Sequence, residues 1–135
     1  AESICRDILA LEPEHPGALR SLGLALTDQF SVSLSRHFTE ALSVIGRLED
    51  PYERVYYAGV AWERAGKSQL SRAELRNAAV SITNAMKHFD EAGELHPDRA
   101  DPVLRWNRCV RMFTDHPDLG AALVYSDEDP LSFGD

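Results

Sequence analysis

The chain has 135 residues, of which 44% are hydrophobic and 27% charged, a composition typical of one folded domain and too apolar for a disordered segment. No apolar run approaches the roughly 20 residues of a membrane-spanning helix, and no secretory signal is visible. The net charge is −8, with 14 Lys and Arg against 22 Asp and Glu, and no strongly basic, aromatic-studded surface is visible. We therefore expect neither a nucleic-acid nor a membrane partner.

The acidic charge is concentrated at the C-terminal end of the chain. Every Lys and Arg lies at or before Arg111, whereas six Asp and Glu residues follow it. We expect residues 126–135 to form an acidic, mobile tail. The chain opens at Ala1 inside a helical pattern, so we expect it to be a fragment of a longer protein. Cys5 and Cys109 also lie within helical patterns and are interpreted as small buried hydrophobic residues. No disulfide framework is suggested, which favours a reducing compartment such as the cytoplasm.

Apolar residues recur with helical spacing along the whole chain, and no strand pattern stands out. This periodicity predicts an all-α fold, with helices over residues 1–12, 16–29, 33–49, 52–65, 71–95, 100–114 and 117–124. Pro13 lies just past the end of the first helix, and Pro16 can open the second because a proline there loses no needed hydrogen bond. Gly23 costs roughly 1 kcal/mol relative to Ala inside a helix, so we expect it to permit close packing against a neighbouring helix.

The stretch after residue 65 has unusual boundaries. We interpret Gly66 as the C-cap of the fourth helix. Ser71 and Glu74 have the spacing of a capping box, which predicts that the fifth helix starts there. That helix would keep one apolar face to residue 95 and span roughly 36 Å at 1.5 Å per residue.

Two segments, residues 1–13 and 85–97, match each other. In each, small or apolar residues recur at i, i+4 and i+7, and a proline closes the segment at i+12. A second helical pattern follows each proline after the same short gap, which is the signature of a helical-hairpin array. On these spacings the chain resembles the tetratricopeptide repeat family over residues 1–114. The positions that carry the resemblance are Ala1, Cys5, Ile8 and Pro13; Leu19, Leu22, Gly23 and Leu26; Leu34, Phe38 and Ala41; Val55, Ala58, Gly59, Trp62 and Gly66; Ala85, Phe89, Ala92 and Pro97; and Val103, Trp106, Asn107 and Val110.

The resemblance implies antiparallel helical hairpins stacked as a short right-handed α-α superhelix, a solenoid over residues 1–125. Two features depart from the family pattern. Residues 67–84 form an insertion that must lengthen a helix or add a turn, and Asn107 stands where Gly is usual.

By the same resemblance, the first helix of each hairpin lines a concave groove that binds an extended peptide. The residues that project toward this groove are Arg20, Leu24, Tyr56, Val60, Glu63, Arg64, Leu104, Arg108 and Arg111. Four of the nine are arginines, which can each hold a carboxylate with two hydrogen bonds. The apolar members could seat apolar side chains. The expected partner is therefore a protein or peptide segment that is partly acidic and partly apolar.

We expect a non-catalytic interaction scaffold with no catalytic residue, cofactor or metal site. Gly66-Lys67-Ser68 resembles the end of a phosphate-binding loop, but it follows a helix and Ala61 replaces the first glycine. No histidine pair has metal-ligand spacing beside cysteines or acids.

One alternative function is homo-oligomerisation through exposed repeat ends and a 71–95 helix that projects beyond the stack. Others are docking of tail 126–135 in its own or a neighbour's groove, and a regulatory fragment of a larger enzyme.

Overall fold

The computed structural model of the chain describes the backbone of residues 1–128 and the side chains of residues 1–124. Within this range the chain forms helices and no strand, which confirms the all-α prediction. The helices are α1 (Glu2–Leu11), α2 (Pro16–Thr27), α3 (Leu34–Ile45), α4 (Pro51–Ser71), α5 (Leu75–Leu95), α6 (Asp101–Asp115) and α7 (Pro117–Glu128). None of these helices combines the length and the apolar composition needed to cross a bilayer.

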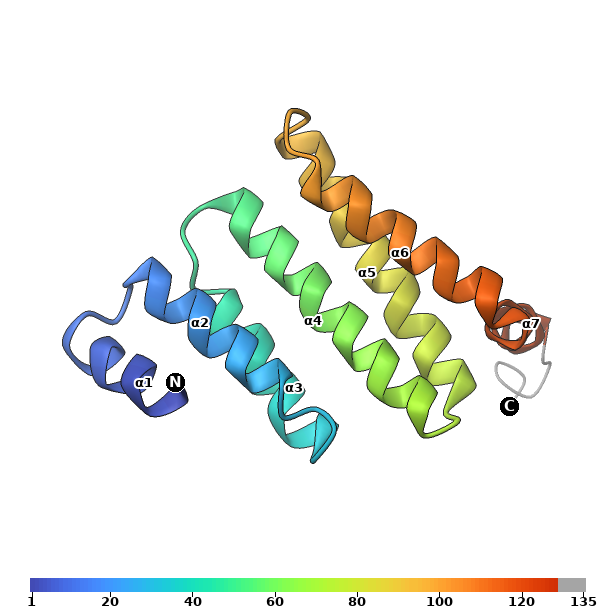
Figure 1. Ribbon diagram of the computed structural model, residues 1–135, viewed down its shortest axis with the longest axis horizontal. Coiled ribbons are helices and arrows are strands. Elements are labelled where there is room, and N and C mark those ends of the chain that lie inside the picture. Colours follow the sequence, from blue (N-terminus) through green and yellow to red (C-terminus); the bar gives the residue numbers. More distant parts are fainter. Residues whose placement is uncertain (129–135) are drawn as a thin grey trace.

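The helices α2, α4 and α6 run in the same direction, side by side in the view of Figure 1. Helices α3 and α5 return behind them in the opposite direction. Each helix packs against its neighbour in the chain, from α1 on α2 to α6 on α7, and α2 also contacts α4. Helix α7 packs mainly against α5. The molecule is therefore an elongated row of helices, with α2, α4 and α6 on one face.

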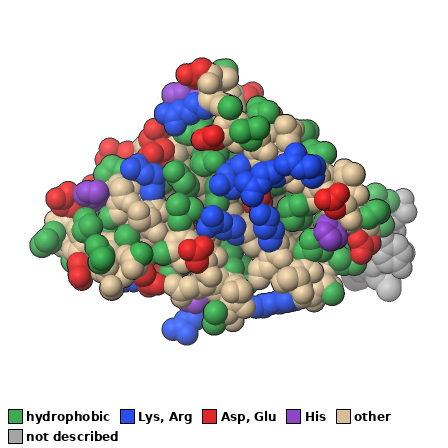
Figure 2. All heavy atoms as spheres, viewed as in Figure 1, with side chains coloured by type: hydrophobic (Ala, Val, Ile, Leu, Met, Phe, Trp, Pro, Cys, Tyr) green, Lys and Arg blue, Asp and Glu red, His purple; other side chains and the backbone are tan. Residues whose placement is uncertain are grey.

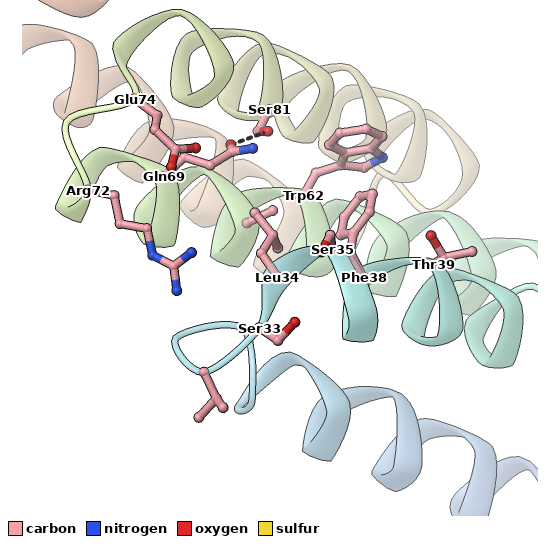
Figure 3. Close-up of a pocket in the computed structure, with 12 residues that line it drawn as sticks. Ser33, Leu34, Ser35, Phe38, Thr39, Trp62, Gln69, Arg72, Glu74 and Ser81 are labelled. Atoms are coloured by element: carbon pink, nitrogen blue, oxygen red, sulfur yellow. Dashed lines mark hydrogen bonds between the residues drawn. The ribbon is translucent and has the colours of Figure 1, made fainter.

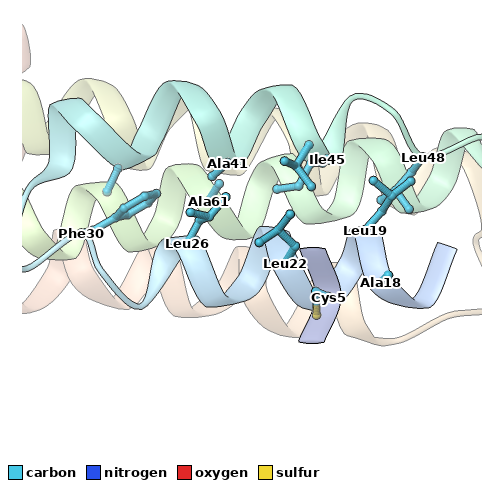
Figure 4. Packing of buried hydrophobic residues seen from close by; sticks show 12 residues of the cluster. Cys5, Ala18, Leu19, Leu22, Leu26, Phe30, Ala41, Ile45, Leu48 and Ala61 are labelled. Carbon is cyan, nitrogen blue, oxygen red and sulfur yellow. The ribbon is translucent and has the colours of Figure 1, made fainter. Parts of the chain in front are cut away.

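The N-terminal half of the core forms between α2, α3 and α4 (Figure 4). Leu19, Leu22 and Leu26 follow the helical period of α2 and are all buried. Gly23 lies beside them, and a Cβ at this position would stand 2.8 Å from Ile45 Cγ1. This contact confirms that the glycine permits a close approach between α2 and α3.

The α4–α5 hairpin is held together by two glycine contacts one heptad apart. A Cβ on Gly59 would stand 2.7 Å from Phe89 Cε1, and a Cβ on Gly66 would stand 2.6 Å from Ile82 Cγ1. Phe89 and Ile82 are also seven residues apart, so the two large side chains of α5 fill the two gaps in α4 in antiparallel register. Gly66 therefore lies inside the helix, and its interpretation as the C-cap after residue 65 was wrong.

The turn between α4 and α5 also differs from the prediction. Ser71 is the last residue of α4, and its hydroxyl donates to the Ser68 carbonyl at 2.7 Å, so it does not cap α5. Helix α4 ends in a Schellman arrangement, in which the amides of Ala73 and Glu74 donate to the carbonyls of Leu70 and Gln69. Ala73 has a φ of 59°, the left-handed conformation that such an ending requires. The capping-box spacing was misleading because Ser71 belongs to the last turn of α4 and the Glu74 amide takes part in the hydrogen bonds that end that helix.

Residues 67–84, the expected insertion, are divided between the end of α4 and the start of α5, which each have 21 residues. The expected projection of the fifth helix beyond the stack is not seen, because its buried positions run from Ala78 to Ala92. Helices α4, α6 and α7 all contact it.

Smaller differences affect the other helix ends. Helix α3 stops at Ile45, short of residue 49, and Gly46 is its C-cap. Helix α7 continues to Glu128, so residues 126–128 of the expected tail are helical. The remainder of the tail, and with it the expectation that the tail docks in a groove, lies outside the described residues. Cys5 and Cys109 are both buried and unpaired, as predicted.

Candidate functional site

The nine residues predicted to line a groove lie on α2, α4 and α6, the three helices that share one face in Figure 1. Arg20 and Leu24 are on α2, and Leu104, Arg108 and Arg111 are on α6. The remaining four, Tyr56, Val60, Glu63 and Arg64, are on α4 between them. The structure thus brings side chains together that are far apart in the sequence.

The apolar members of this set are unequally accessible. Leu104 is 57% exposed and can contact a ligand. Val60 is 1% exposed and packs with Ile82 and Phe89, because its side of α4 faces α5. Leu24 and Tyr56 are half-buried against the same cluster. Val60 therefore does not line a surface, and Leu104 is the apolar residue of the nine that is most open to a partner.

Glu63 is the central charged residue of this face and is completely buried. Arg105 Nη1 donates to Glu63 Oε1 at 3.2 Å. Lys67 Nζ lies 3.4 Å from Glu63 Oε2, and Arg108 Nη2 lies 3.9 Å from the same oxygen. Three cations from two helices thus surround one carboxylate and offset part of the cost of burying its charge, while Glu63 Oε2 makes no hydrogen bond.

This arrangement, which we call the Glu63 cluster (Tyr56, Glu63, Lys67, Arg105 and Arg108), carries excess positive charge. One carboxylate balances one of its three cations. Lys67 and Arg108 are about half exposed, so their remaining donors face solvent. Figure 2 shows blue side chains gathered on the face that displays α4 and α6. The cluster can therefore attract an anionic group from outside.

Arg105 was missed in the sequence analysis, although it holds the cluster together. Its Nε donates to Tyr56 Oη at 2.7 Å, and its guanidinium lies 5.7 Å from the centre of the Tyr56 ring. Burial acts to lower the pKa of Arg105, but the hydrogen bond to Tyr56 and the charge of Glu63 outweigh it, so the pKa is raised. The spacing i, i+3, i+6 of Arg105, Arg108 and Arg111 was the signal that could have found it.

Two of the predicted arginines are already engaged within the chain. Arg20 Nη1 lies 2.8 Å from Glu53 Oε2. Arg64 Nη1 donates to Thr27 Oγ1 at 2.6 Å and lies 3.3 Å from an Asp28 oxygen. These contacts tie α2 to α4. Arg111 is exposed and has no ion pair among the described side chains. On the face formed by α2, α4 and α6, the accessible positive charge is therefore concentrated at Lys67, Arg108 and Arg111.

A separate cleft of about 590 Å³ lies between α3 and the α4–α5 hairpin (Figure 3). Its apolar wall contains Phe38 and Trp62, whose ring centroids are 4.7 Å apart in an edge-to-face arrangement. At its polar end, Ser81 Oγ lies 2.6 Å from the Gln69 side chain, and Arg72 donates to the Ser31 carbonyl at 2.7 Å. The cleft gathers no group of like-charged side chains, so the Glu63 cluster is the stronger candidate site.

The remaining sequence motifs have structural explanations. Gly66-Lys67-Ser68 lies inside α4, and the Ser68 hydroxyl donates to the Phe30 carbonyl at 3.2 Å. His15 caps α2, because its Nδ1 accepts from the Ala18 amide at 3.0 Å. Over the side chains that the structure describes, no three His, Cys, Asp or Glu groups gather as metal ligands would.

The chain was compared with known proteins in three ways. A scan against protein-family models, a search of curated proteins and a search of solved structures each gave no match.

Proposed function

We propose that this chain is a non-catalytic interaction module that binds an acidic and partly apolar segment of a partner protein on the α2–α4–α6 face. The observation that carries the proposal is the Glu63 cluster, in which one buried carboxylate holds three cations and leaves positive charge at the surface. Arg108 and Arg111 lie three residues apart on α6 and can engage neighbouring carboxylates. Leu104, exposed on the same helix, offers an apolar contact.

The packing supports a rigid platform for such binding. Arg105 reaches from α6 to two side chains of α4, and Arg64 reaches from α4 to α2. A module whose contacts are held in place loses little conformational entropy on binding. The parallel order of α2, α4 and α6, with α3 and α5 returning behind them in the opposite direction, agrees with a short array of tetratricopeptide-like hairpins. We propose this right-handed stacking as the architecture that makes the face concave.

A peptide-display selection with the folded chain as bait tests this function. We expect the bound peptides to be enriched in Asp and Glu interspersed with large apolar residues. The variant Arg108→Glu/Arg111→Glu should lose these peptides, with its helical circular dichroism unchanged. The matched control is Arg76→Glu/Lys87→Glu, which makes the same charge change at two exposed positions of α5 and should retain them.

Three outcomes would contradict the proposal. Selected peptides without acidic enrichment would remove the assigned partner chemistry. Retention of the acidic peptides by the folded Arg108→Glu/Arg111→Glu variant would move the site off this face. Equal loss in both double variants would show a long-range effect of net charge instead of a site. If Arg108→Glu unfolds the chain by facing Glu63, Arg111→Glu alone gives the same test away from that carboxylate.

A further inference from the structure

An apolar trough of about 570 Å³ lies where the C-terminal end of α5 meets the N-terminal end of α6, outside the Glu63 cluster. Gly93 and Pro102 contribute to its floor, and a Cβ on Gly93 would stand 4.0 Å from Pro102 Cβ. The absence of a side chain at Gly93 therefore keeps the trough open. We call this feature the α5–α6 trough.

The trough exposes large apolar side chains. Val103 is 58% exposed and Trp106 is 38% exposed, and both line the trough from α6. They are three residues apart and share one side of the helix. Helix α7 packs nearer the other end of α6, where Met112 and Phe113 join the core cluster that contains Leu119. No described residue covers Val103 and Trp106 in the same way.

The rim of the trough is acidic. Asp90 and Glu94 lie one turn apart on α5, are both exposed, and have no ion pair among the described side chains. The nearby arginines are engaged elsewhere. Arg99 lies 4.6 Å from the centre of the Tyr52 ring, and Arg105 is bound to Tyr56 and Glu63. Asp90 and Glu94 are the charged residues that line the trough, so its rim carries the opposite sign to the Glu63 cluster.

We propose that the α5–α6 trough docks an amphipathic helix of a partner protein, with apolar side chains facing Val103 and Trp106 and Lys or Arg side chains reaching Asp90 and Glu94. A helix fits because apolar residues at i and i+3 or i+4 match the spacing of the exposed pair on α6. Basic residues one turn apart along that helix match the roughly 6 Å rise between the two carboxylates. The molecule then binds segments of opposite charge on two separate surfaces.

The test uses two synthetic helical peptides of 15 residues with the same leucine stripe, one with Lys and one with Glu beside the stripe. Binding is followed by the fluorescence of Trp106 in a Trp62→Phe background, which removes the other tryptophan. We expect the Lys peptide to shift the Trp106 emission to the blue and to saturate, and the Glu peptide to bind at least about fivefold more weakly.

Charge reversal on the rim gives the matched comparison. Glu94→Lys should weaken binding of the Lys peptide about five- to tenfold, because an attractive pair becomes repulsive. Glu91→Lys changes another exposed glutamate of the same helix, outside the trough, and should change the affinity less than twofold. Gly93→Leu should abolish binding by filling the floor. Arg108→Glu/Arg111→Glu should leave binding of the Lys peptide intact, which separates this site from the proposed acidic-segment site.

Several results would overturn the docking site. Equal affinity for the Lys and Glu peptides would remove the role of the carboxylates. Equal effects of Glu91→Lys and Glu94→Lys would indicate general electrostatic attraction. Saturable binding without a change in Trp106 emission, or unchanged binding in Gly93→Leu, would place the peptide elsewhere on the chain.

Discussion

Gly66 on α4 lies against Ile82 on α5 so closely that a methyl group at position 66 would stand 2.6 Å from Ile82 Cγ1. The Ala78 carbonyl oxygen would stand 3.4 Å from the same methyl group. Ile82 is fully buried and β-branched, so its side chain has few alternative rotamers. Position 66 therefore determines how near α4 and α5 can approach.

We expect Gly66→Ala to lower the free energy of unfolding by about 1–2 kcal/mol, because the strain of overpacking exceeds the gain in helix propensity. Urea unfolding monitored by circular dichroism measures this change. The control is Gly120→Ala, since a Cβ at Gly120 meets nothing within 4 Å and should stabilise α7 by up to about 1 kcal/mol. In a double-mutant cycle, Ile82→Ala should relieve part of the loss from Gly66→Ala. Full additivity would argue against the contact.

Removing the negative charge of Glu63 without changing the size of its side chain should lower the stability of the fold. Glu63→Gln keeps the size of the side chain but leaves Lys67, Arg105 and Arg108 without their common partner. We expect a loss of about 2 kcal/mol, below the value for a fully buried pair because the cations are partly exposed. Chemical denaturation at low and high salt measures it, and added salt should lessen the loss by screening the repulsion.

Arg105 and Arg108 should contribute unequally to the stability of this cluster. Arg105 is 24% exposed and makes two hydrogen bonds, whereas Arg108 is 46% exposed and lies 3.9 Å from Glu63. Arg105→Gln should therefore destabilise the fold by about 1–2 kcal/mol, and Arg108→Gln by less than about 0.5 kcal/mol. The reverse order would contradict the assignment of Arg105 as the residue that positions the cluster.

The left-handed conformation of Ala73 predicts that glycine is preferred there. A residue with a Cβ is destabilised by about 1–2 kcal/mol in the left-handed region. Glycine removes this cost, but its greater freedom in the unfolded chain offsets part of the gain in stability. We expect Ala73→Gly to raise the free energy of unfolding by about 0.5–1 kcal/mol. Ala121→Gly, at an exposed helical position of α7, should instead lower it by up to about 1 kcal/mol. Destabilisation by both substitutions would argue against the Schellman ending.

The buried thiol of Cys109 predicts a dependence on alkaline pH. Burial, followed by the charge of Glu63, raises the pKa of Cys109 from an ordinary value near 9 to about 12. The unfolded chain then loses this proton first, so the contribution of the thiol is complete below about pH 9 and is lost as the pH rises toward 12.

Urea unfolding at pH 8 and pH 10.5 checks this dependence against the variant Cys109→Ala. The variant should be less stable at pH 8 because of the cavity, but it should lose less stability between the two pH values. Burial also raises the pKa values of Tyr52 and Tyr57, and those contributions are common to both proteins. Equal losses in the two proteins would mean that the thiol ionises normally in the folded state.

The periodicity of the sequence was sufficient for the all-α class, because helical spacing of apolar residues is a local property. The second and fourth helices, predicted to start at residues 16 and 52, start at Pro16 and Pro51. Only Pro16 was interpreted as opening a helix, although proline fixes φ in the first turn of both. Gly23 and Gly66 show the limit of such reasoning. Both glycines allow a neighbouring helix to approach, but only Gly23 was interpreted that way, because Gly66 also suited a helix end.

For the candidate site, the helical phase of α6 indicated Arg108 and Arg111, and the phase of α4 indicated Glu63. The sequence could not show that Glu63 is buried, that Arg105 joins it to Tyr56, or that Val60 faces α5. It likewise could not show that Asp90 and Glu94 border an open trough beside Trp106. These relations join residues on different helices, and such contacts depend on how closely the helices pack. Local spacing thus determined which elements form, while tertiary packing decided which charges meet and which apolar side chains remain exposed.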